Sequence, residues 1–140
     1  MTRPYLFPFT LEHGQHALGY NKSTKDINGC QNDPDKAHDL GKARKLLHEN
    51  PNVWIDTAQR IDELGRHPRA VARFFLDFQD RILYGTDGLP DRDKIEIYWR
   101  FFETDDDYFD YYPEHKPRKG LWKIHGLNLP DPVLKKLYYG

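Results

Sequence analysis

Hydrophobic positions in the second half of the chain recur with the spacing of an α-helix. Val71, Phe74, Phe75 and Phe78 follow one another at i, i+3, i+4 and i+7, which places them on one helical face. Pro68 suits the first turn of that helix. The same spacing predicts three further helices, whose expected inner faces are Leu40, Ala43, Leu46 and Leu47; Ile95, Tyr98, Trp99 and Phe102; and Leu134, Leu137 and Tyr138.

Two short apolar runs between these helices predict buried β-strands. The run "VWI" ends at Asp56, and the run "ILY" leads into "GTDG", which contains Asp87. Both runs are continuously apolar, as expected for strands that are covered on both faces. About thirty residues separate Asp56 from Asp87, which is the size of one βαβ unit. We therefore expect an α/β fold with a parallel sheet.

Two segments show no regular periodicity. Residues 1–36 contain the polar stretch "YNKSTKDINGCQNDPDK" and are predicted to be irregular or disordered. The segment "ETDDDYFDYYPEHKPRKG" is acidic and aromatic and then basic, so it predicts a long, solvated loop with anchoring aromatic residues. Asp91 or Asp93 could cap the helix before this loop. Residues 37–140 contain all the predicted helices and strands.

Composition limits the classes of partner. The 140 residues carry a formal net charge of -1 and are 38% hydrophobic. This balance gives no electrostatic reason to expect nucleic acid or an anionic membrane as a partner. No apolar run approaches the roughly 20 residues of a membrane span. Cys30 is the only cysteine, which fits a reducing compartment, and we expect a cytoplasmic protein.

Candidate chemistry lies where the two predicted strands end. Neighbouring parallel strands lie roughly 4.8 Å apart, so Asp56 and Asp87 would face the same rim of the sheet. A carboxylate there can bind a divalent metal or accept a proton from water. Gly85 and Gly88 leave room for a ligand. The alternative is a turn or cap role, which the pattern alone favours for Asp87 and favours more strongly for Asp56.

Residues from about Asp39 to Gly140 resemble a known family. The matching pieces are "NVWIDTA", "FFLDFQDRILYGTDG" and "LPDPVLKKLYYG". They are similar to the C-terminal part of the amidohydrolase-related hydrolases (amidohydrolase family 2), the branch that includes decarboxylases of the aminocarboxymuconate-semialdehyde type. The resemblance implies a partial (β/α)8 TIM barrel that comprises the last two to three β/α units, preceded by an irregular N-terminal segment.

The resemblance also implies a function. In such enzymes the aspartate that matches Asp87 binds the catalytic metal, for which zinc is favoured, and accepts a proton from the metal-activated water. The expected reaction is hydrolysis of a C–N or C–O bond in a small-molecule substrate, or a related decarboxylation. Asp56 would lie at the rim after the seventh strand, and Arg60 could contact an anionic substrate. A surface or ion-paired role is the alternative for Arg60.

The chain departs from the family pattern at the other metal ligands. The family's His-x-His pair and the histidines of its fifth and sixth strands have no counterpart, and "CQNDPD" stands near the sixth-strand position. A catalytic zinc ion usually needs three protein ligands, and a closed barrel typically needs about 250 residues. We therefore expect a fragment that is inactive alone and does not hold the metal stably.

Two non-hydrolytic hypotheses stand beside this one. A non-catalytic α/β fragment could act through partner binding or through self-association by its open sheet edges. A different doubly wound domain could bind a small molecule at its strand ends. The Gly-rich phosphate loop that would favour a nucleotide is absent, since "GTDG" does not match G-x-G-x-x-G.

Overall fold

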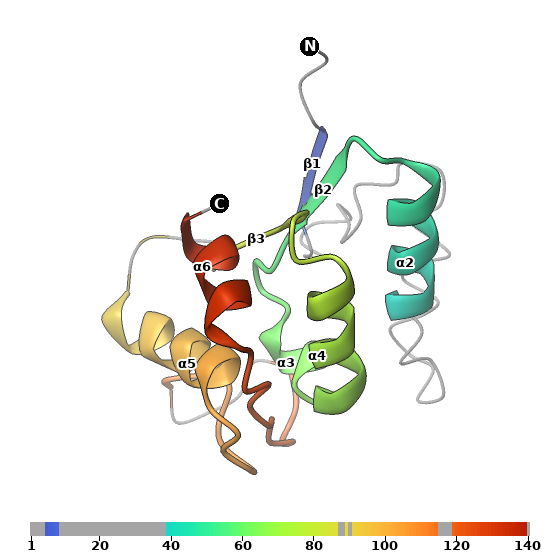
Figure 1. Ribbon diagram of the computed structural model, residues 1–140. Helices are drawn as coiled ribbons and strands as arrows, with labels where there is room; N and C mark the ends of the chain where they lie inside the picture. Colours follow the sequence, from blue (N-terminus) through green and yellow to red (C-terminus); the bar gives the residue numbers. More distant parts are fainter. Residues whose placement is uncertain (1–4, 9–38, 87–88, 90, 115–118, 140) are drawn as a thin grey trace.

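The computed structural model describes residues 5–8, 39–86, 89, 91–114 and 119–139. Figure 1 shows the arrangement of the helices and strands in this part of the chain. In chain order the elements are β1 (Tyr5–Pro8), α2 (Asp39–Glu49), β2 (Val53–Asp56), α3 (Ile61–Leu64), α4 (Pro68–Asp77), β3 (Ile82–Leu83), α5 (Arg92–Glu103) and α6 (Asp131–Tyr139).

The strands form a small parallel sheet in the order β1-β2-β3. Val53 is in register with Tyr5, and Ile55 is in register with Ile82. The prediction that the two apolar runs form strands of a parallel sheet is confirmed, and the structure shows β2 and β3 as neighbours. β1 was not predicted, because it lies within residues 1–36, where the sequence shows no strand pattern.

The prediction of a partial (β/α)8 TIM barrel is wrong. Helices dominate the described residues, and β3 has only two residues. The chain leaves the sheet at Tyr84, whose backbone N–H donates to the Leu137 carbonyl of α6 at 3.3 Å. A helix thus lies beside β3, where a barrel would continue with another strand. The result is a small, helix-rich fold.

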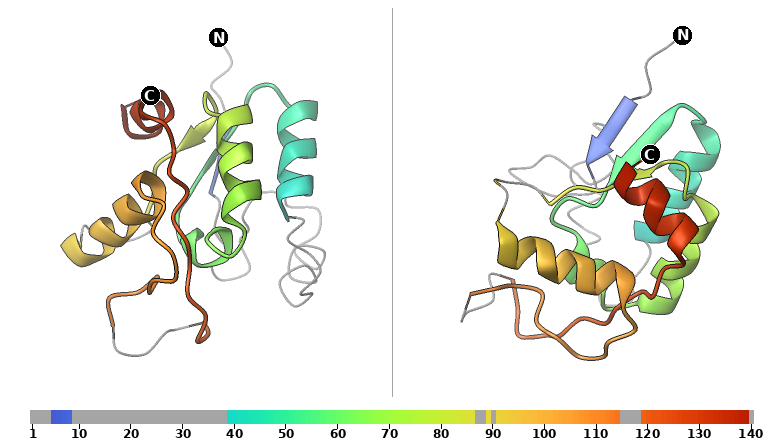
Figure 2. Two further views of the ribbon diagram at one scale, coloured as in Figure 1. Left: turned by 60° about the horizontal axis from the view of Figure 1, so that its bottom comes forward. Right: turned by 60° about the vertical axis from the view of Figure 1, so that its left-hand side comes forward.

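The helix predicted at Pro68 is confirmed, and it packs beside α2 (Figure 2). All four residues of its predicted inner face are buried. The ring of His48 lies edge-on to Phe78 with centroids 5.2 Å apart. Arg44 of α2 forms a 2.6 Å ion pair with Asp77 at the end of α4. Apolar burial therefore joins the two helices, with one ion pair at their exposed margin.

The last two helices bury faces that differ partly from the prediction. Asp91 is confirmed as the N-cap of α5, because its side chain accepts a hydrogen bond from the Asp93 backbone at 3.1 Å. The predicted inner residue Trp99 is 47% exposed, and Phe101 is fully buried instead. The Phe101 carbonyl accepts from the Leu127 N–H at 2.7 Å, so the C-terminal part of α5 lies against the segment that leads into α6. The buried face of α5 therefore contains Phe101 and not Trp99.

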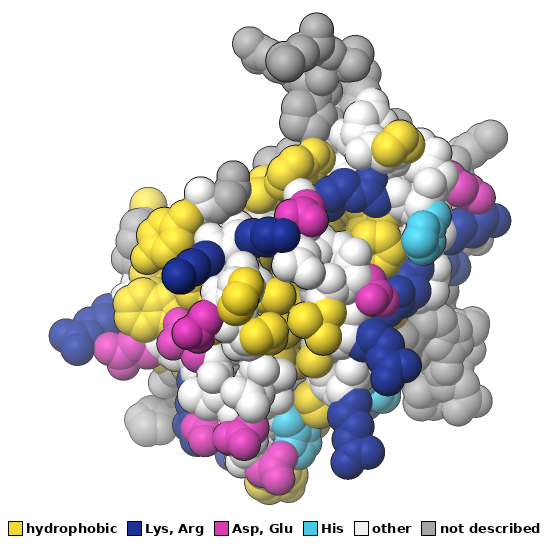
Figure 3. All heavy atoms as spheres, viewed as in Figure 1, with side chains coloured by type: hydrophobic (Ala, Val, Ile, Leu, Met, Phe, Trp, Pro, Cys, Tyr) yellow, Lys and Arg dark blue, Asp and Glu magenta, His cyan; other side chains and the backbone are white. Residues whose placement is uncertain are grey.

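Described residues between α5 and α6 follow an irregular course, as predicted. Their single bridge joins Phe109 and Ile124 in antiparallel fashion. The segment still adds three residues to the core, Ile124, Leu127 and Leu129. On the face seen in Figure 3, hydrophobic side chains gather over α6 with charged groups around them. None of the helices in the described ranges has the length and apolar character needed to cross a bilayer.

Candidate functional site

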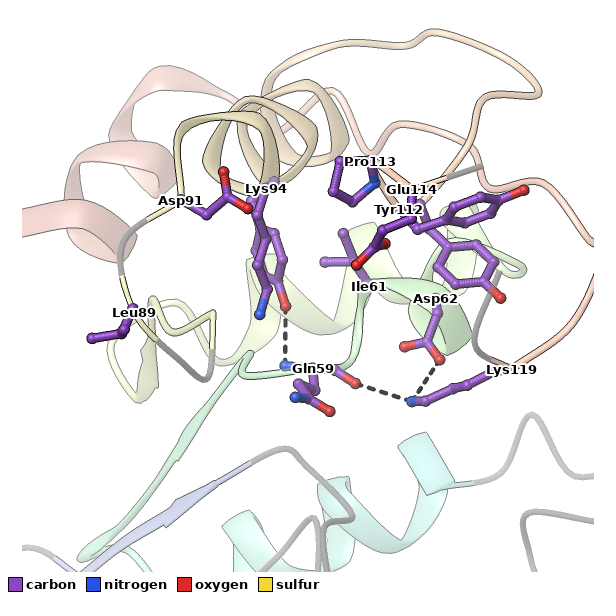
Figure 4. A pocket seen from close by; sticks show the side chains of 12 residues that line it. Gln59, Ile61, Asp62, Leu89, Asp91, Lys94, Tyr112, Pro113, Glu114 and Lys119 are labelled. Atoms are coloured by element: carbon purple, nitrogen blue, oxygen red, sulfur yellow. Dashed lines mark hydrogen bonds and ion pairs between the residues drawn. The ribbon is translucent and has the colours of Figure 1, made fainter. Parts of the chain in front are cut away.

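A cavity of about 340 Å³ lies among residues that follow β2 and β3 in the chain (Figure 4). Its walls come from the turn after β2, the start of α3, the first half of α5 and the loop after α5. It is therefore assembled from segments that are far apart in sequence. The lining residues are Gln59, Ile61, Asp62, Leu89, Asp91, Lys94, Tyr98, Tyr111, Tyr112, Pro113, Glu114 and Lys119.

The turn after β2 forms one wall of the cavity. The Asp56 carboxylate accepts a hydrogen bond from the Ala58 N–H at 2.9 Å, which closes a local turn at the strand end. Gln59 then takes a left-handed backbone conformation, with φ of 54°. Its N–H donates to the hydroxyl of Tyr98 at 3.0 Å. The buried ring of Tyr98 thereby fixes an unusual backbone turn beside the cavity.

The ends of β2 and β3 are tied together by one buried hydroxyl group. The Thr57 Oγ1 donates to the Gly85 carbonyl at 3.0 Å and accepts from the Gly85 N–H at 3.1 Å. A Cβ added to Gly85 would lie 3.3 Å from the Cβ of Ala58, so the two turns approach closely. This reciprocal pair sets the spacing of the two loops that leave the sheet toward the cavity.

An ion pair between the buried Asp62 and the partly exposed Lys119 forms a second wall. The Asp62 side chain is 5% exposed, and its carboxylate lies 2.7 Å from the Lys119 ammonium group. The indole N–H of Trp122 donates to the Asp62 carbonyl at 2.9 Å, and the Arg66 guanidinium lies over the Trp122 ring at 4.9 Å. Both the side chain and the backbone of Asp62 therefore hold the loop after α5 against α3.

Tyr111 closes the loop upon itself. Its hydroxyl donates to the Gly120 carbonyl at 2.8 Å and accepts from the Gly120 N–H at 3.0 Å. Its ring stacks on Trp122 and meets Tyr112 edge-on, with centroids 5.6 Å and 4.9 Å away. Burial raises the pKa of Tyr111, so its hydroxyl stays protonated at neutral pH. The aromatic side of the cavity is thus held by directed contacts.

The two predicted site residues that the structure describes, Asp56 and Arg60, do not line the cavity. Asp56 takes the turn role that its pattern favoured. Arg60 is 4% exposed, beside the start of α3, and it does not line the cavity. Asp87, the predicted metal ligand and base, lies outside the described residues. Metal-dependent hydrolysis by Asp87, and weak or absent zinc binding by this chain, stay predictions.

No group of three His, Cys, Asp or Glu side chains could hold a metal within the part of the chain that the structure describes. The polar groups that shape the cavity were missed by sequence reasoning. Asp62 and Lys119 are too far apart in the chain for any periodicity to pair them. The one available signal was the "YFDYY" run, whose aromatic residues were expected to anchor the loop, and Tyr111 does so.

Comparisons with protein-family models, with curated proteins and with solved structures found no match to this chain.

Proposed function

We propose that this chain is a binding domain for a small organic molecule, which it holds in the cavity beside Tyr98, Tyr111 and Tyr112. The observation that carries the proposal is the cavity itself. Its volume of about 340 Å³ falls within the range of ligand pockets, which is roughly 300–1,000 Å³. Aromatic and apolar walls with a few oriented polar groups are the usual composition of such pockets.

The rigidity of the walls supports the proposal. Tyr98 fixes Gln59, and Tyr111 fixes Gly120, each through hydrogen bonds of 3.0 Å or less. The Asp62–Lys119 ion pair holds the loop to α3. Walls that are already ordered lose less conformational freedom when a ligand binds, so more of the contact energy appears as affinity.

The position in the fold also supports it. Gln59 and Ile61 follow the carboxyl end of β2, and Leu89 and Asp91 follow that of β3. In open sheets with parallel strands, ligands commonly bind in the crevice beyond the carboxyl ends of the strands. This location argues for ligand binding and leaves the chemistry of any reaction undetermined, so the proposal is for binding alone.

A fragment screen tests this proposal on the whole chain. Backbone amide resonances would be followed while aromatic and polar fragments are added. We expect bound fragments to shift the resonances of residues 59–62 and 111–114. Tyr112→Ala should weaken their binding about tenfold, because it removes one aromatic wall.

Tyr139→Ala is the matched control, because Tyr139 is 87% exposed at the end of α6 and does not line the cavity. It should leave fragment affinity unchanged. A screen in which no fragment shifts residues 59–62 would overturn the proposal. So would fragment binding that Tyr112→Ala and Tyr139→Ala weaken equally.

A further inference from the structure

The outer side of α4 carries a basic face, formed by Arg69 and Arg73. Both side chains are exposed, and they lie one helical turn apart. Neither forms a hydrogen bond or an ion pair within the part of the chain that the structure describes. The nearest acid along the same side of the helix is Asp77, which is already bound to Arg44 at 2.6 Å. The basic face therefore presents its positive charge to the solvent.

The loop after α5 carries an acidic tip, formed by Asp105, Asp107 and Tyr108. Asp105 is exposed and forms no ion pair among the described residues. The Asp107 side chain is 88% exposed and lies 2.9 Å from the His125 ring, which balances its charge only when the ring is protonated. In Figure 3, dark-blue side chains gather over α4 and magenta side chains gather below α5, so one side of the molecule carries both charges.

Tyr108 presents an aromatic ring at the acidic tip. It is 71% exposed, and its φ of 62° is a left-handed conformation that costs a tyrosine on the order of 1 kcal/mol. The next residue fixes this turn, because Phe109 and Ile124 exchange backbone hydrogen bonds of 3.0 and 2.9 Å. Arg100 also lies over the Phe109 ring at 4.3 Å. The fold therefore holds an exposed ring in a costly position, which is typical of functional loops.

We propose that the acidic tip binds the basic face of α4 in a second copy of this chain, so that two copies form a two-fold dimer. The complementary charges of the two surfaces carry this inference. The Tyr108 ring adds a face on which an arginine guanidinium group can lie. Since one side of the molecule carries both surfaces, a two-fold axis forms the same contact twice.

A second copy fits these surfaces better than a nucleic acid does. A long polyanion that lay on the basic face would also meet the acidic tip, where like charges repel it. The net charge of -1 opposes the approach of two copies only weakly. The inference is independent of the proposed binding of a small molecule, because none of Arg69, Arg73, Asp105, Asp107 and Tyr108 lines the cavity.

Sedimentation velocity on the whole chain tests the dimer. At low salt we expect a change from monomer to dimer between about 10 µM and about 1 mM, and salt at about 0.5 M should weaken the dimer about tenfold by screening. The double variant Arg69→Glu, Arg73→Glu should stay monomeric over this range. Lys135→Glu is the control, because it reverses a charge of the same sign at an exposed position on α6. It should dimerise as the wild type does.

A charge exchange shows that the two surfaces meet each other. The double variant Asp105→Lys, Asp107→Lys should also stay monomeric alone. An equimolar mixture of this variant with Arg69→Glu, Arg73→Glu should dimerise again, because each contact between the two variants joins opposite charges. Misfolded variants could not restore the dimer in this way.

Tyr108→Gly tests the ring separately from the charges. Glycine adopts a positive φ without strain, so the variant should keep or exceed the thermal stability of the wild type. Loss of the ring should weaken the dimer about threefold. Tyr139→Ala, at an exposed ring on α6, should leave the dimer unchanged.

Three outcomes would overturn the inference. A wild type that stays monomeric up to about 1 mM at low salt would exclude the dimer and leave the small-molecule function in place. A dimer that both charge reversals leave intact would belong to another surface. If the mixed variants stay monomeric and the wild type binds single-stranded DNA through Arg69 and Arg73, the basic face serves a different polyanion.

Discussion

Two regions of this molecule are built by different means. The helical region, residues 39–56 and 68–83, joins α2 and α4 to the sheet through repeated apolar faces. The site region, residues 57–67, 91–114 and 119–130, surrounds the cavity, and hydrogen bonds between side chains and the backbone hold its loop. Figures 1 and 2 show α2 and α5 at opposite sides of the described structure.

Burial of side chains and directed hydrogen bonds contribute differently: burial mainly stabilises the fold, and hydrogen bonds mainly fix its geometry. Burial of a large side chain contributes roughly 1.5–3 kcal/mol and has no preferred direction. A hydrogen bond contributes only about 1 kcal/mol net but fixes a direction. Both regions bury large side chains, Phe74 in the helical region and Phe101 and Phe102 in the site region, so we expect burial to stabilise both. The hydrogen bonds of the loop should add little stability and mainly fix the geometry of the cavity.

The largest effect should come from the helical region. Phe74 is fully buried in α4, and Phe74→Ala should lower the free energy of unfolding by about 3–5 kcal/mol through lost burial and a residual cavity. Urea denaturation followed by tryptophan fluorescence measures this change. Leu76→Ala on the same helix is the control, because Leu76 is 44% exposed. Equal losses in the two variants would show that burial of the Phe74 ring is not a main source of the stability of the fold.

A smaller, local effect should come from the loop of the site region. Trp122→Phe removes the indole donor to the Asp62 carbonyl and should cost about 1 kcal/mol. Hydrogen exchange should become faster in residues 105–127 and stay unchanged in α4. Trp99→Phe on α5 is the control, and it should change neither segment. Equal loss of protection in α4 would show that the two regions do not open separately.

The smallest effect should appear as a pH dependence. Burial, and next the neighbouring Asp62, raise the pKa of Glu63 above its usual value, although Arg66 partly opposes this. The folded state then binds the Glu63 proton more tightly than the unfolded state does. Stability from this group is complete below the ordinary carboxyl pKa of about 4 and is lost as pH rises through the raised value.

Glu63→Gln removes that titration. Thermal melts should show nearly equal stability for variant and wild type at about pH 4, and a rising advantage for the variant toward neutral pH. Glu49→Gln at the exposed end of α2 should show no such trend. An advantage of Glu63→Gln that is the same at every pH would rule out burial of Glu63 as its cause.

Periodicity explains which parts of the fold were predictable. The spacing of Val71, Phe74, Phe75 and Phe78 identified the buried face of α4, because residues three, four and seven positions apart lie on the same side of a regular helix. On α5 the same reasoning selected Trp99, since several apolar stripes were possible and tertiary packing selected the one that contains Phe101. The barrel was predicted from resemblance, and it failed where α6 lies beside β3.

The cavity could not be predicted from spacing. Asp62 meets Lys119, and Gln59 meets Tyr98, although α4 and β3 lie between the partners in the chain. Such pairs depend on where a loop returns, and loop paths are set by packing rather than by a repeat. The turn role of Asp56 was accessible from the sequence, because its hydrogen bond to Ala58 is local, and the aromatic run around Tyr111 indicated the anchoring of the loop.

Tyr98 belongs both to the hydrophobic core and to the wall of the cavity. Its ring packs among Tyr84 and Phe102, while its hydroxyl holds the Gln59 turn at the cavity wall. A substitution that repacks the core therefore also displaces a wall of the cavity. The core and this wall of the cavity cannot be redesigned as separate modules, and the shape of the cavity could be changed from core positions that do not line it.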